Sequence, residues 1–316
     1  MIVFISLIIG PMIFWFALFT LQKVGRTMDY IIDQFNQWIK DFLIGCITNN
    51  LSGLFDTVNT KVGEIAVEVG KTPSGWNGGV LSMIHSVSDT VIIPIAGMIL
   101  AFVLTYELIQ MLIDRNNLHE VDSWIFFKWI FKSFVAIYLV THTFEMVMAV
   151  FDVAQHVVSG SQGVISSQTS IDIASAISDL ETTLQGMGIG ELFGLCMETL
   201  LIRFTMNIMS WCVFIIIYGR MIEIFLYCSL GPIPLATMAN RDWGQMGQNY
   251  LRALFALGFQ GFLILICVGI YAVMVKAITT SADIHAAVWA VAGYTVLLCF
   301  SLFKTASLSK SIFNTH

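Results

Sequence analysis

Ionisable side chains interrupt the long apolar stretches of this sequence, and the types and positions of five of them are the first indication of chemistry. They are Glu107, Glu145, Arg203, Arg220 and Glu223. A charged group at membrane depth costs about 2.5–3.5 kcal/mol on insertion scales, so each needs a partner or water. Two interpretations stay open. Either these groups line an aqueous path between subunits, or they pair with other groups and reach the helix ends.

The spacing of these groups allows one pair within a helix. Arg220 and Glu223 stand three positions apart, which suits an intrahelical ion pair. Glu107 and Glu145 would lie at unequal depths in an antiparallel hairpin, so we do not expect them to meet. His142 and Glu145 have the spacing of two metal ligands on a helix face, but no second pair accompanies them.

Signatures of enzymes are missing from the sequence. No complete Walker loop is present, because the Gly70-Lys71-Thr72 triplet has Ile65 where the first glycine would stand. No serine nucleophile elbow occurs. The six cysteines form no CxxC motif, and their preferred interpretation is as small buried hydrophobic residues. We expect no catalytic residue, no cofactor and no metal.

Composition places the chain in a membrane. Only 11% of its residues are charged, and its mean hydropathy is +0.82. Several uncharged stretches of 16 to 23 residues follow one another, and roughly 20 apolar residues in a helix cross a bilayer. The stretches are continuous rather than alternating, which selects helices over a barrel. We predict an all-α, polytopic transmembrane helical bundle with about five core spans.

The predicted organisation has five parts. Residues 1–27 are either an extra N-terminal span, over Met1 to Phe19, or a misassigned segment upstream of a true start at Met28. Residues 28–90 form an external amphipathic region, 91–152 a transmembrane hairpin with spans at about 91–113 and 124–150, 153–190 an external Ser/Gly-rich loop, and 191–316 the C-terminal transmembrane region. The amphipathic helix at 28–48 lies either in the membrane interface, on a partner, or on the protein's own bundle.

Lys and Arg set the expected orientation, because they collect in cytoplasmic loops. They place residues 114–123 inside, whereas 153–190 contain neither residue type and fall outside. Arg241, Arg252 and the basic C-terminus fall inside if Leu192–Ala239 crosses once, which we prefer. Two crossings there are the alternative.

A helix break is expected at Gly231-Pro232-Ile233-Pro234, since proline lacks an N–H and clashes with the preceding turn. Carbonyls freed there need water or protein. We expect this elbow, with Arg241, Asp242 and Trp243, to dock cytoplasmic ATPases or neighbouring subunits. The alternative is a plain bend at the membrane boundary.

The stretch from Arg220 to Trp243 resembles the signature segment of TrbL-type proteins, the polytopic membrane subunits of conjugative type IV secretion systems, equivalent to the sixth VirB subunit. The amphipathic start, Val62–Val80 and Val91–Leu100 are similar to the same group, in its Gram-positive conjugative-element branch. The resemblance covers residues 28–316.

This resemblance implies an assembled channel or platform component in the cell membrane. Its implied partners are other secretion subunits including cytoplasmic ATPases, further copies of itself, and a transient single-stranded DNA–relaxase substrate. Two other functions stay open: a secondary transporter with a broken-helix substrate site, and a scaffold that conducts nothing.

Overall fold

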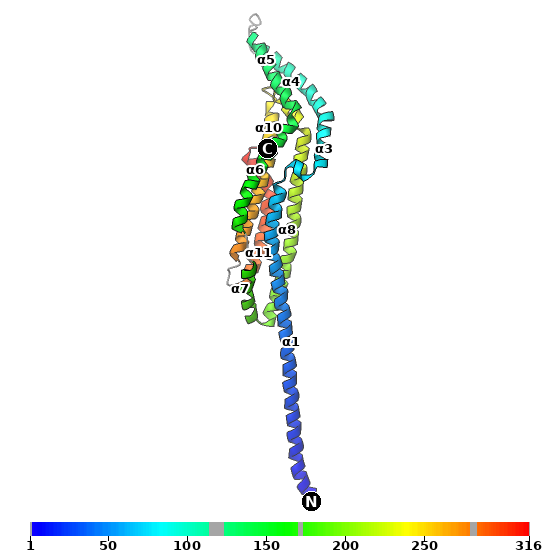
Figure 1. Ribbon diagram of the computed structural model, residues 1–316, viewed down its shortest axis with the longest axis vertical. Helices are drawn as coiled ribbons and strands as arrows, with labels where there is room; N and C mark the ends of the chain where they lie inside the picture. The colour runs from blue at the N-terminus through cyan, green and yellow to red at the C-terminus, as the bar shows by residue number, and fades with distance from the viewer. Residues whose placement is uncertain (1, 114–122, 170–172, 279–282, 316) are drawn as a thin grey trace. The chain divides into compact units, whose positions relative to one another are not determined.

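The computed structural model describes residues 2–113, 123–169, 173–278 and 283–315, with the side chains of 2–26, 166, 169, 173–177 and 179 left aside. Every regular element in these ranges is a helix, as predicted (Figure 1). The helices are α1 (Ile2–Val69), α2 (Pro73–Trp76), α3 (Gly78–Val87), the π-helix η1 (Ser88–Ile92), α4 (Ile93–Ile113), α5 (Ser123–Thr141), α6 (Thr143–Thr169), α7 (Ile173–Gly186), α8 (Ile189–Leu230), α9 (Pro232–Thr237), α10 (Gly244–Ile278) and α11 (Ile284–Ile312).

Five helical segments of the described chain are long and apolar enough to cross a membrane. They are Gly78–Ile113, Ser123–Thr141, Ile189–Leu230, Gly244–Ile278 and Ile284–Ile312. The prediction of about five core spans in an all-α polytopic bundle is therefore confirmed. The predicted extra span at Met1–Phe19 falls on side chains outside the described part.

The chain forms two compact units, of which the first comprises Met1–Phe55 and Asp172–Arg203. On α1, Leu43 and Ile47 are buried, whereas an apolar stripe on the same helix is exposed. That stripe includes Phe35, Trp38 and Phe42, whose rings stack at centroid distances of 6.1 and 6.0 Å. The amphipathic pattern therefore presents its aromatic side chains outward, as a helix at a membrane interface does.

The second unit comprises Asp56–Ile171 and Phe204–His316, and α10 lies at its centre between α6 and α11 (Figure 1). Small residues let α6 approach α10 closely, as is common between membrane helices. A Cβ added at Gly258 would lie 3.1 Å from the Cβ of Ala154, and one at Gly269 would lie 2.9 Å from Ile165. The size of the residues on α10 therefore sets the distance between these helices.

The predicted break ends α8 where the prolines begin. α8 runs unbroken for 42 residues to Leu230, and the short helix α9 starts at Pro232. An unbroken helix cannot turn back, which supports a single crossing here. α9 packs against α4 and α5, where Ala236 and Ala239 join Leu100, Val103 and Ala136 in one buried cluster.

The predicted span at 124–150 falls on two helices, because the helix is interrupted at His142 between α5 and α6. Three successive side chains bond to carbonyls of the preceding turn at this point. Thr141 Oγ1 donates to Ile137 O, His142 Nδ1 lies 3.1 Å from Tyr138 O, and Thr143 Oγ1 donates to Leu139 O. Such bonds compete with the helix ladder and bend helices.

Residues 153–190 are not a loop over their described part. α6 continues through Thr169 and α7 covers Ile173–Gly186. Serine and glycine lower helix propensity by only about 1 kcal/mol or less per residue, and packing against α10 overrides this cost for α6. The span expected from about residue 91 also has helix before it, with η1 where Pro94 cannot donate to the carbonyl four residues earlier.

Candidate functional site

A buried polar network holds the loop that follows α9. Asn240 is 1% exposed. Its Nδ2 donates to Glu107 Oε2 at 2.8 Å and to Gln110 Oε1 at 2.9 Å, both on α4. Its Oδ1 accepts the backbone N–H groups of Asp242 at 2.9 Å and Trp243 at 3.2 Å. One amide side chain thus fixes the loop backbone and joins it to the α4–α5 pair.

The network is completed by a charge pair and a second bridge. Lys132 of α5 donates to Glu107 Oε1, so the carboxylate is bonded on both oxygens. Gln110 Nε2 donates to Asp242 Oδ2 at 2.7 Å. Glu107 is 7% exposed, and a buried carboxylate is tolerated only when paired and hydrogen-bonded. The arrangement satisfies that requirement.

The loop held by this network presents its own side chains outward. Arg241, Asp242 and Trp243 are all exposed. The Trp243 ring stacks on Phe102 at 5.5 Å and on Tyr106 at 5.9 Å, with interplanar angles of 26° and 15°. The result is a fixed surface with one cation, one anion and an aromatic ladder.

The elbow at Gly231 and Pro232 is not accessible to solvent. Gly231 and Pro232 are buried, and a Cβ at Gly231 would lie 2.5 Å from Tyr250 Oη and 2.7 Å from Thr143 Cγ2. The carbonyl of Pro234 accepts from Thr237 Oγ1 at 2.7 Å. The protein's own side chains therefore cover Gly231 and Pro232, and the most accessible residues of this region are those of the exposed loop.

Arg220 is 5% exposed and bonds to backbone carbonyls of two other helical segments. Its Nε donates to Leu257 O at 3.0 Å and its Nη2 to Gly258 O at 3.3 Å, both on α10. Its Nη1 donates to Val69 O at 3.2 Å, at the end of α1, where carbonyls lack helix partners. A Cβ at position 261 would lie 3.0 Å from Arg220 Nη2, so Gly261 makes room for the guanidinium.

The remaining membrane-depth candidates lie apart. Glu223 pairs with Lys310 of α11 at 3.0 Å, so the expected Arg220–Glu223 pair is wrong. Arg203 is exposed and donates to Asn50 Oδ1 at 3.4 Å. Glu145 is exposed in the first turn of α6, where a negative charge is favoured by the helix dipole, and α6 is not among the five candidate spans of the described chain.

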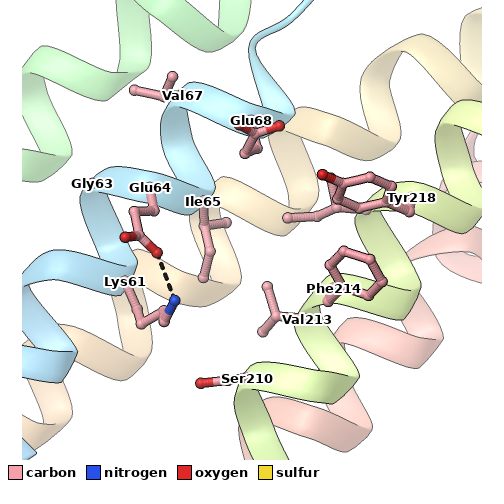
Figure 2. Close-up of a pocket in the computed structure, with 11 residues that line it drawn as sticks. Lys61, Gly63, Glu64, Ile65, Val67, Glu68, Ser210, Val213, Phe214 and Tyr218 are labelled. Atoms are coloured by element: carbon pink, nitrogen blue, oxygen red, sulfur yellow. Dashed lines mark hydrogen bonds and ion pairs between the residues drawn. The ribbon is translucent and has the colours of Figure 1, made fainter. Parts of the chain in front are cut away.

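A groove of 510 Å³ lies between the end of α1 and the middle of α8 (Figure 2). Ile65, Val213 and Phe214 make its wall apolar, and Lys61 pairs with Glu64 at 2.6 Å on its rim. Within the described residues, no group of three or more His, Cys, Asp or Glu side chains is placed to hold a metal ion. The groove suits an apolar occupant more than a polar substrate.

Sequence reasoning missed Lys132, Gln110 and Asn240. For Lys132 a signal existed, because residues at equal depth in an antiparallel hairpin are equally far from its turn. Glu107 lies 11 residues and Lys132 lies 14 residues from the middle of the connection at 114–122, which is a similar distance. Applying the hairpin geometry to opposite charges would have paired them.

Comparison with known proteins agrees with this architecture. A family profile described as TrbL/VirB6 plasmid conjugal transfer like protein matches residues 58–232, more than half of the chain, from the end of α1 to the elbow. Comparison with curated proteins and with solved structures gives no significant match. The chain belongs to the TrbL/VirB6 conjugal transfer family, and it is a multi-pass membrane component of conjugal transfer.

Proposed function

We propose that this chain is a channel or platform component of a conjugative type IV secretion system, which helps to move single-stranded DNA with its relaxase across the cell membrane. Family membership supplies the setting. The observation that carries the proposal is the exposed Arg241–Trp243 loop, which the buried Asn240 network holds in one conformation. This loop is the docking surface.

The loop has the chemistry of a protein contact. Tryptophan and arginine are the residue types most enriched at binding hot spots, and both are exposed here. A surface fixed before binding loses less conformational entropy when it binds. Arg241 and Arg252 favour the cytoplasmic side. Its partners are therefore cytoplasmic ATPases of the system or neighbouring copies of this subunit.

The conduit part of the proposal depends on polarity rather than on positive charge. With a net charge of −6, the subunit cannot hold DNA by neutralising phosphates. Polar groups around a shared lumen would let the strand slide. Glu145 and Arg203 are the exposed members of the predicted set, so they are the residues that we assign to such a lumen. Glu107, Arg220 and Glu223 have partners within the chain and serve its packing.

The alternative function, a secondary transporter, has no room for a substrate at the elbow. It needs unwound carbonyls around a substrate at the elbow, but Tyr250 and Thr143 fill the space beside Gly231. The scaffold alternative shares every contact described here, so only an experiment on DNA separates it from a conduit.

The docking surface is tested with a photo-crosslinking amino acid at Trp243, with Trp211 as a matched control because it is an exposed tryptophan on α8. We expect Trp243 to crosslink an ATPase or a second copy during transfer, and an Arg241→Glu change to remove that product. Crosslinking at Trp243 that does not exceed the level at Trp211 would contradict the assignment.

Substrate DNA is tested by crosslinking it to the full-length subunit in transferring cells and precipitating the subunit. Recovery of the transferred strand supports a conduit. If the strand is recovered with the ATPase but not with this subunit, the protein is a scaffold.

A further inference from the structure

Two cysteines lie in contact in the first unit, 150 residues apart in the sequence. The Sγ atoms of Cys46 on α1 and Cys196 on α8 are 3.1 Å apart. All six cysteines of the chain are free thiols in the structure. A disulfide requires an S–S distance of about 2.05 Å, so a movement of about 1 Å would join this pair.

We propose that Cys46 and Cys196 are a disulfide-forming site that covalently links the amphipathic helix α1 to the start of α8. Cys46 Sγ accepts from Cys196 Sγ at 3.1 Å and from Asn50 Nδ2 at 3.7 Å. These two bonds hold Cys46 Sγ beside Cys196, and the thiolate is the reactive form of either cysteine.

Exposure assigns the order of the two steps. Cys46 is half-buried, whereas Cys196 is 5% exposed. The Cys46 thiolate therefore attacks an external disulfide first and forms a mixed disulfide, releasing one thiol of the oxidant. The Cys196 thiolate then attacks Cys46 Sγ and releases the second thiol. Two thiols are oxidised, one external disulfide is reduced to two thiols, and the two cysteine protons pass to the leaving sulfurs.

The expected topology places this site where such oxidants act. Cys46 lies in the external amphipathic region, and Cys196 lies two turns into α8, directly after the segment expected outside. Disulfides form and persist on the outer side of the cell membrane and not in the cytosol. A cytoplasmic position would leave the same pair reduced.

The other cysteines provide the comparison. Cys299 lies against Cys212, and Cys212 is 16 residues further into the candidate span Ile189–Leu230 than Cys196, about 24 Å along the helix and away from water-soluble oxidants. Cys267 on α10 is half-buried. We expect neither that pair nor Cys267 to take part.

The test uses the full-length protein in isolated membranes, treated with oxidised glutathione. Free thiols are then blocked with N-ethylmaleimide, the sample is reduced, and newly freed thiols are labelled with a maleimide polymer that retards the chain on a gel. Wild type, Cys267→Ser and the Cys212→Ser/Cys299→Ser variant should each gain two labels. Cys46→Ser should gain none, and Cys196→Ser should gain one at most, because its Cys46 stays in the mixed disulfide with glutathione.

Mass spectrometry of the unreduced digest should find the peptides of Cys46 and Cys196 joined. Because Cys46→Ser changes a half-buried position by one atom, its loss of label does not arise from misfolding. The proposal is wrong if wild type gains no labels, if Cys46→Ser keeps both, or if the joined peptides contain Cys212 and Cys299.

Discussion

At the scale of single residues, two buried polar side chains, Arg220 and Asn240, use hydrogen bonds to the backbone to join separate parts of the chain. Arg220 binds three carbonyls on two other helical segments, and Asn240 uses its oxygen for two backbone N–H groups. Guanidinium donors have a fixed planar geometry that a lysine cannot reproduce. Arg220 therefore fixes the positions of α8, α10 and the end of α1 relative to one another.

Replacing Arg220 with methionine should destabilise the protein, because the change keeps most of the volume and removes all three bonds. A hydrogen bond of a charged group contributes about 1.5–3 kcal/mol net, and methionine also avoids the cost of burying the charge, so we expect a loss of about 2 kcal/mol or more. Thermal unfolding in detergent measures it. Arg203→Met is the control on the same helix, since Arg203 is exposed with one bond of 3.4 Å, and should change stability by about 0.5 kcal/mol or less.

Asn240→Asp should release the loop, whereas Asp242→Asn should leave it in place. The first change replaces the Nδ2 donor with an oxygen that faces Glu107 Oε2 and Gln110 Oε1, so two buried carboxylates would meet. The second keeps an acceptor for Gln110 Nε2 on the exposed side. Limited proteolysis near Trp243 should increase only for Asn240→Asp. Equal cleavage of both variants would mean that the network does not hold the loop.

At the scale of elements, the parts that follow from local chemistry could be predicted from the sequence, and the parts that depend on partners could not. Hydropathy locates the spans, and Pro232 ends α8. The turn at His142 was missed because it depends on side chains that bond back into their own helix. The carbonyl partners of Arg220 have no side-chain signature at all, so no spacing rule points to Val69 or Leu257.

Replacing both Pro232 and Pro234 with alanine should abolish DNA transfer while membrane insertion survives. Proline in a helix interior costs about 3 kcal/mol or more, so its removal lets α8 continue straight. A straight α8 would withdraw Ala236 and Ala239 from their cluster with α4 and α5. Mating assays and membrane fractionation measure the two effects. Normal transfer by the double variant would show that the elbow is only a bend.

At the scale of the whole molecule, length limits what the bilayer can contain. α5 and α6 together comprise 46 residues and follow one another along the second unit (Figure 1). At 1.5 Å per residue they amount to about 70 Å of helix, more than twice the roughly 30 Å hydrocarbon core. Much of α6 must therefore extend beyond the hydrocarbon, which is consistent with its serine, glutamine and aspartate content.

Cysteines introduced at Asn117 and Ser167, in a chain whose native cysteines are replaced by serine, should react differently with an impermeant maleimide. Asn117 falls outside the described residues, in a segment that contains Arg115 and is followed by Lys128 and Lys132, and Lys and Arg keep such segments in the cytoplasm. Ser167 is exposed near the end of α6, within residues 153–190, which contain no Lys or Arg. In intact cells only Ser167→Cys should be labelled, and permeabilised cells should label both. Equal labelling in intact cells would overturn the orientation, and with it the cytoplasmic assignment of the Arg241–Trp243 loop.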